Sequence, residues 1–145
     1  MKDFRKLKVW DRAHQLVLTV YQTTMSFPRD ETYGLTAQIR RSASSIPSNI
    51  GEGCGRDGDA ELARFCRIVC GSASELEYQI LLAHDLKLIP SGHYQQLTEE
   101  ITEIKRVLTV LVQKLNADRR MLRARGLPSP QLWSRPRAAL CGLSR

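Results

Sequence analysis

The chain has 145 residues, of which 42% are hydrophobic and 26% charged, with a formal net charge of +7 at pH 7. This size predicts one domain. Its first residues, MKDFRKLKVWD, lack the apolar core of a signal peptide, and its longest apolar run, Ile80–Ala83, is too short to span a bilayer. We therefore expect a soluble, cytoplasmic protein with no membrane partner.

Two helices are predicted in the first part of the chain. Apolar residues at helical spacing indicate a first helix from about Val9 to Ser26, which Phe27-Pro28 ends because a residue before proline avoids the α region. A second helix begins near Gly34-Leu35 and contains Pro47. The glycines at positions 51, 53, 55 and 58 are then expected to break this helix.

Two more helices follow. The third is predicted from Asp59 to about Asp85, and the fourth from Ser91 to Leu115. Apolar residues in the fourth recur at alternating steps of four and three: Leu97, Ile101, Ile104, Leu108, Leu111 and Leu115. This heptad pattern is typical of a helix packed lengthwise against other helices. A rod of roughly 37 Å with one apolar stripe is not stable alone in water, so the predicted fold is all-α, a helix bundle over residues 1–117.

The C-terminal part differs in charge and composition. Residues 1–117 carry 15 Lys and Arg against 14 Asp and Glu, whereas residues 118–145 carry seven Arg against Asp118 alone. Three prolines and few periodic apolar residues accompany these arginines. This composition predicts a flexible, Arg-rich tail over residues 118–145.

No catalytic motif is complete. Residues 53–58 match the glycine spacing of dinucleotide-binding loops, but a helical pattern precedes them and no segment is typical of a strand. None of the three histidines has a glutamate three residues before it, as bundle di-iron sites require. The four cysteines have no metal-ligand spacing, and we expect reduced thiols. The sequence therefore predicts no enzyme, no cofactor and no metal site.

Arginines on the predicted bundle are the candidate functional groups. Five of them are candidates for a nucleic-acid surface: Arg40, Arg41, Arg56, Arg64 and Arg67. Guanidinium groups suit bidentate contacts with phosphate. An ordinary solvated face is an equally good interpretation, since Glu61 lies three residues before Arg64 and favours a local ion pair.

The tail offers a second set of basic residues, which begins with Arg119 and Arg120 and includes Arg123, Arg125, Arg135 and Arg137. These side chains would attract phosphates whatever the base sequence. If six phosphates were neutralised, the log–log salt slope on single strands would be about −4. A merely solvated basic terminus is the alternative.

Gly71 and Ser74 continue the face of the third helix that carries Arg64 and Arg67. A glycine inside a helix costs nearly ~1 kcal/mol relative to alanine. Close approach of a helix from a neighbouring subunit would compensate, so we expect an oligomer contact at these two residues. Local tolerance of a weak helix former is the alternative.

Three segments carry a family resemblance: FRKLKVWDRAHQLV (Phe4–Val17), YGLTAQIRRSASSIPSNIGEGCGR (Tyr33–Arg56) and ARFCRIVCGSASELEYQILLAHDLKLI (Ala63–Ile89). Together they resemble the four-helix-bundle family of proteins encoded in intervening sequences of bacterial 23S ribosomal RNA genes. They are also similar to the accessory variability proteins of diversity-generating retroelements. The 28-residue C-terminal segment after residue 117 is extra to this pattern.

The resemblance implies an up-down-up-down bundle and a ring-shaped homopentamer with a positively charged surface. For the retroelement relatives it also implies binding to nucleic acid and to a reverse transcriptase, without catalysis. Carried onto this chain, the binding positions are Arg40, Arg41, Arg64 and Arg67. We therefore expect a non-catalytic, homo-oligomeric bundle that binds RNA or DNA. A protein-interaction scaffold for a partner such as a reverse transcriptase is the alternative.

Overall fold

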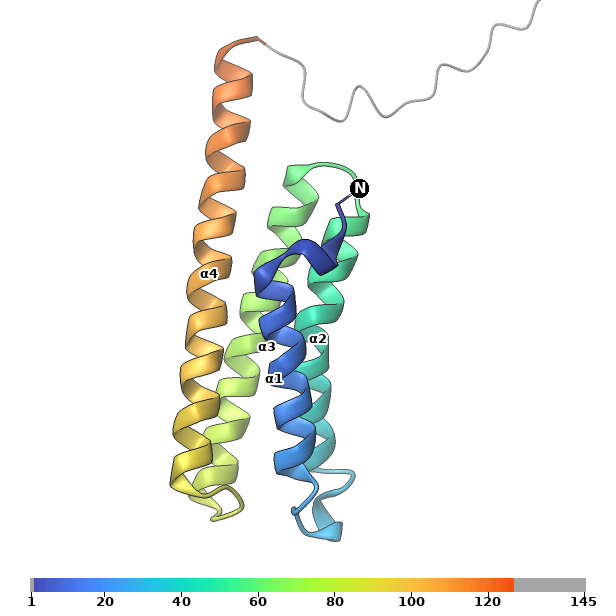
Figure 1. Ribbon diagram of the computed structural model, residues 1–145, viewed down its shortest axis with the longest axis vertical. Coiled ribbons are helices and arrows are strands. Elements are labelled where there is room, and N and C mark those ends of the chain that lie inside the picture. The colour runs from blue at the N-terminus through green and yellow to red at the C-terminus, as the bar shows by residue number, and fades with distance from the viewer. Residues whose placement is uncertain (1, 127–145) are drawn as a thin grey trace, which may run out of the picture.

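The structure is a computed structural model and describes residues 2–126. Four α-helices run alternately up and down: α1 (Lys8–Thr24), α2 (Leu35–Gly55), α3 (Asp59–Asp85) and α4 (Ser91–Ala124) (Figure 1). Single 3-10 turns lie at Phe4–Lys6 and Arg29–Glu31, and residues 2–126 contain no strand. The prediction of an all-α, up-down-up-down four-helix bundle is confirmed.

Each helix buries one apolar face in a common core. In α4 the heptad positions Leu97, Ile101, Ile104 and Leu108 are at most 1% exposed, and Leu115 is 5% exposed. Full burial of one such side chain stabilises a fold by about 1.5–3 kcal/mol. The seven-residue pattern therefore identified the packed face of α4 correctly.

The prediction that the glycines break the second helix is wrong for Gly51 and Gly53. α2 continues through Gly51 and Gly53 and ends only at Gly55. A Cβ atom at Gly53 would lie 2.7 Å from the Cβ of Phe65 on α3, closer than two such atoms can approach. Gly53 thus allows α2 and α3 to pack closely, and this packing compensates for its weak helix propensity.

The predicted start of the flexible tail at residue 118 is also wrong, because α4 continues through residues 118–124. Asp118 interrupts the apolar heptad, but the backbone stays helical since Ala, Arg, Met and Leu are strong helix formers. The helix ends at Ala124, and Gly126, just after the C-cap residue Arg125, has a φ of 64° that suits glycine and an N–H that donates to the carbonyl of Arg123. The rest of the predicted tail, residues 127–145, lies outside the described residues.

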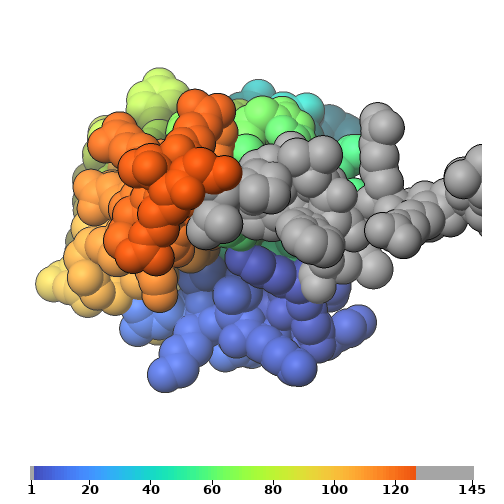
Figure 2. Space-filling view, turned by 90° about the horizontal axis from the view of Figure 1, so that it is seen from above, coloured from blue at the N-terminus to red at the C-terminus, as the bar shows by residue number. Residues whose placement is uncertain are grey.

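α4 projects beyond the other helices. α3 and α4 leave the same connection, residues 86–90, but α4 has 34 residues and α3 has 27. At 1.5 Å per residue, α4 is about 10 Å longer. Its end, here called the α4 extension (residues 116–125), passes the ends of α2 and α3 (Figure 1). Figure 2 views the molecule from this side, where the N-terminal segment and the α2–α3 connection also lie.

Candidate nucleic-acid interface

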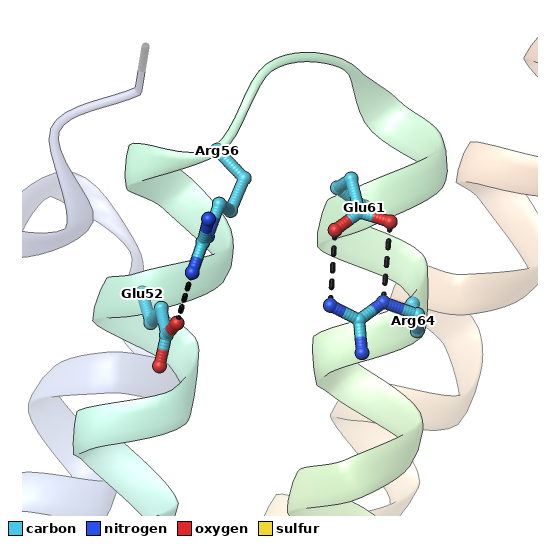
Figure 3. Close-up of polar contacts among 4 residues, drawn as sticks. All are labelled: Glu52, Arg56, Glu61 and Arg64. Carbon is cyan, nitrogen blue, oxygen red and sulfur yellow. Dashed lines mark hydrogen bonds and ion pairs between the residues drawn. The ribbon is translucent and has the colours of Figure 1, made fainter.

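Two of the predicted binding arginines, Arg56 and Arg64, form ion pairs with glutamates that precede them by four and three residues (Figure 3). Arg56 Nη2 lies 2.6 Å from Glu52 Oε1, and Arg64 donates two hydrogen bonds of 3.0 and 3.1 Å to the carboxylate of Glu61. The guanidinium of Arg64 also lies 4.5 Å from the centre of the Phe65 ring. Guanidinium N–H groups of Arg56 and Arg64 that would donate to a phosphate therefore already donate to glutamates.

The same local pairing occurs on α4. Arg106 donates two hydrogen bonds to Glu103, at 2.7 and 2.8 Å, and Arg12 of α1 lies 3.0 Å from the same carboxylate. The hydrogen bonds from Arg106, with the charge of both arginines, lower the pKa of Glu103 to about 2. Hydrogen bonding to Arg64 likewise lowers the pKa of Glu61. These carboxylates therefore stay ionised and paired throughout the neutral range.

Arg40 has a structural contact across two helices. Its Nε donates to Thr24 Oγ1 at 2.8 Å, and its guanidinium lies 4.6 Å from the centre of the Tyr21 ring. Tyr21 is 43% exposed, and the guanidinium of Arg40 packs on its ring. Arg40 thus connects α2 to α1.

Arg41 and Arg67 are the two predicted bundle arginines that remain available. Both are exposed, on α2 and α3 respectively, and neither has a hydrogen-bond, ion-pair or ring partner among residues 2–126. Neither position has an acid three or four residues before it. Their guanidinium groups are therefore free to contact an external anion.

The predicted oligomer contact lies on the outer face of α3. Gly71 and Ser74 are exposed, and within the described part of the chain no neighbouring atom lies within 4 Å of a Cβ built at Gly71. No helix of the same protomer approaches this glycine. Apolar side chains on α3 are exposed around it: Ile68 is 41%, Leu81 40% and Tyr78 62% exposed.

The α4 extension holds another group of arginines. Arg119, Arg120 and Arg123 line a shallow hollow of about 270 Å3 together with Asn116. Their spacing of three, four and seven residues from Asn116 places all four on one face of the helix. Within residues 2–126, none of these four side chains has a hydrogen-bond or ion-pair partner.

Charge is separated along the α3–α4 pair. Residues 104–126, toward the α4 extension, carry seven Lys and Arg against Asp118. Residues 73–103, around the α3–α4 connection, carry six Asp and Glu against Lys87. The residues of α4 near its extension are therefore more basic than the residues around the α3–α4 connection.

The described residues offer little to a catalytic mechanism. No group of three or more His, Cys, Asp or Glu residues among them is placed to hold a metal ion. Cys54 and Cys66 are buried, and burial raises the pKa of the Cys66 thiol to about 11, so this thiol is protonated at neutral pH. Cys141 lies outside the described residues. Across residues 2–126, no helix has the length and apolar character needed to cross a membrane.

Comparison with known proteins identifies the family. The family of the 23S rRNA-intervening sequence protein matches residues 5–110, most of the four-helix bundle. The chain belongs to this family. A comparison with curated proteins finds no match to this chain.

A solved structure supports the fold. The crystal structure of a protein of unknown function from the S23 ribosomal protein family of Bacteroides thetaiotaomicron has a TM-score of 0.65 to this chain and 23% sequence identity. The similarity covers 72% of this chain and 97% of the other. The likeness to retroelement accessory proteins stays a prediction from the sequence motifs.

The α4 extension lies beyond the family match, which ends at residue 110. Sequence reasoning named Arg119 and Arg120 but placed them in a flexible tail, and it missed Asn116 as their neighbour. The signal was present: helix formers continue to Ala124 and a glycine follows at position 126. Once the helix is extended, the spacing of Asn116, Arg119, Arg120 and Arg123 groups them on one face.

Proposed function

We propose that this intervening-sequence protein is a non-catalytic, homo-oligomeric bundle that binds nucleic acid through exposed arginines. The observation that carries the proposal is the set of guanidiniums that have no partner among residues 2–126, of which Arg119, Arg120 and Arg123 form a group on the α4 extension. Arg41 and Arg67 add free guanidiniums on the bundle. Arginine forks bind phosphate oxygens in pairs, and the basic residues near the α4 extension attract a polyanion toward them.

The outer face of α3 supports self-association. Exposed Ile68, Tyr78 and Leu81 surround Gly71 and Ser74, so a second subunit could approach the helix closely and cover apolar surface. A ring of five subunits is the assembly that the sequence resemblance implies. Such a ring would present each arginine cluster several times and increase avidity for a long polyanion.

Filter binding of RNA and DNA oligonucleotides across a salt series tests the proposal. We expect binding that weakens linearly in log–log form as salt increases, because phosphate contacts release counterions. Light-scattering mass, with and without an RNA oligonucleotide, gives the subunit number. Absent or salt-insensitive binding to both nucleic acids would refute the proposal, and a monomeric mass would refute its oligomeric part.

A scaffold for a protein partner, such as a reverse transcriptase, is the second candidate. The exposed apolar residues on α3, with Tyr78 62% exposed, favour it because protein partners cover such side chains. Affinity capture of the tagged chain from its native host, with and without nuclease, separates the two functions. A partner protein retained after nuclease treatment supports the scaffold, whereas its release supports nucleic-acid binding.

A further inference from the structure

We propose that the α4 extension is a binding site for adjacent phosphates of a nucleic-acid backbone, formed by Arg119, Arg120 and Arg123 around Asn116. This inference rests on the proposed function and assigns the principal contact to a segment that follows the family match at residues 5–110. The site therefore lies outside the residues that the family match covers, at one end of a bundle on which Arg40, Arg56 and Arg64 are engaged in contacts of their own.

Helical geometry separates these arginines from the acid of the segment. At about 100° per residue, Arg119, Arg120 and Arg123 lie within roughly 60° of Asn116 around the helix axis, whereas Asp118 lies on the opposite side with Lys114 and Arg125. Among residues 2–126, the hollow of about 270 Å3 is lined by Asn116 and the three arginines. From this part of the chain, a phosphate entering it would meet guanidinium and amide donors and no carboxylate.

The arrangement is unfavourable without an anion. Arg123 lies four residues after Arg119 and three after Arg120, and like charges at these spacings destabilise a helix. On the bundle, Arg56, Arg64 and Arg106 each have a glutamate at the same spacing instead. A bound phosphate group between the arginines would remove the repulsion and supply the missing partner.

The helix dipole does not account for the cluster. Basic residues stabilise the C-terminal turn of a helix, and Arg123 lies in the last turn of α4. Arg119 and Arg120 are further from the end, where this effect has decayed. Their side chains also find no carboxylate on a neighbouring helix, because α4 has passed the ends of α2 and α3 at this point (Figure 1).

The residues at the site favour contacts with the phosphates of the nucleic-acid backbone over contacts with the bases. Residues 111–126 contain no aromatic side chain on which a base could stack. Asn116 is the single amide at the hollow. We therefore expect sequence-independent binding, with equal affinity for oligo(U) and oligo(A) of the same length and strong dependence on salt.

Two triple variants of the full chain test the site. R119Q/R120Q/R123Q removes the cluster, and R56Q/R64Q/R106Q removes the same net charge from arginines that glutamates already hold. Glutamine is a good helix former, so α4 should persist in the first variant; circular dichroism checks this. Affinity for a 20-nucleotide oligo(U) is measured by fluorescence anisotropy over a salt series.

Each phosphate contact on a single strand contributes about 0.7 to the magnitude of the log–log salt slope. The cluster variant lacks three arginines, so we expect this magnitude to fall by about 2 for each subunit that contacts the oligonucleotide. The control variant should keep most of the wild-type slope. An equal loss of slope in both variants, or an unchanged slope in the cluster variant, would overturn this site. Salt-dependent binding by the wild-type chain would in that case still support the proposed function through other exposed arginines, such as Arg41 and Arg67. Failure of the wild-type chain to bind would instead refute the proposed function.

Inorganic phosphate distinguishes a backbone site from a small-anion site. One free phosphate can occupy a single position between the arginines, whereas linked phosphates contact several at once, so inorganic phosphate should displace oligo(U) only at a large molar excess. Displacement of oligo(U) by stoichiometric inorganic phosphate would overturn the assignment to a nucleic-acid backbone.

Discussion

The two parts of α4 use similar residues for different purposes. Over residues 91–115 the apolar seam is buried and two of the three cations are paired, Lys105 with Glu77 at 2.7 Å and Arg106 with Glu103. Over the α4 extension, burial ends after Leu115 and the arginines at the hollow have no partner within the described chain. The arginines of α4 are thus available for binding where the helix extends past both the buried core and the glutamates that pair with Lys105 and Arg106.

The largest expected difference between the two parts is in stability. Leu108→Ala removes a fully buried side chain, so we expect the free energy of unfolding to fall by about 2–5 kcal/mol. Met121→Ala, at a position 56% exposed in the α4 extension, should change it by no more than about 0.5 kcal/mol. Urea unfolding followed by circular dichroism measures both. A comparable cost for Met121→Ala would mean that the extension is packed in solution.

A smaller effect is expected at the end of the extension. Gly126 has a φ of 64°, where a Cβ atom is unfavourable by about 1–2 kcal/mol. Gly126→Ala should therefore loosen the last turn without unfolding the bundle. Amide hydrogen exchange of residues 122–125 should become faster, while exchange of residues 101–108 stays unchanged. Unaltered exchange in the last turn would show that the glycine does not stabilise the helix end.

The smallest effect concerns the paired carboxylate Glu103. Its pKa is lowered to about 2 from an ordinary 4.5, so its stabilising contribution is complete above about pH 4.5 and disappears as the pH falls toward 2. The free energy of unfolding of the wild type should therefore exceed that of Glu103→Gln at pH 6, with the difference closing near pH 2. Glu99→Gln is the matched control, because it removes a carboxylate of the same helix that has no ion pair among residues 2–126. A constant gap for Glu103→Gln would contradict the proposed pairing.

Local patterns predicted the four helices and the packed face of α4. They also contained the pairing of arginines, since Glu52, Glu61 and Glu103 precede their partners by three or four residues. The predicted end of the fourth helix, Leu115, is the last residue of the apolar repeat, whereas α4 continues to Ala124. Loss of an apolar seam ends packing, whereas helix propensity and the final glycine determine where the backbone stops being helical.

The sequence by itself determined the helical segments, their apolar faces and the arginine–glutamate pairs within a turn, because all of these depend on neighbours three or four residues away. The tertiary structure decided which features served contacts between helices. It placed Gly53 against Phe65 and Arg40 against Thr24, partners that are distant in sequence. It also left the end of α4 beyond α2 and α3, and because of this difference in helix length the arginines of the extension meet no carboxylate of the described chain.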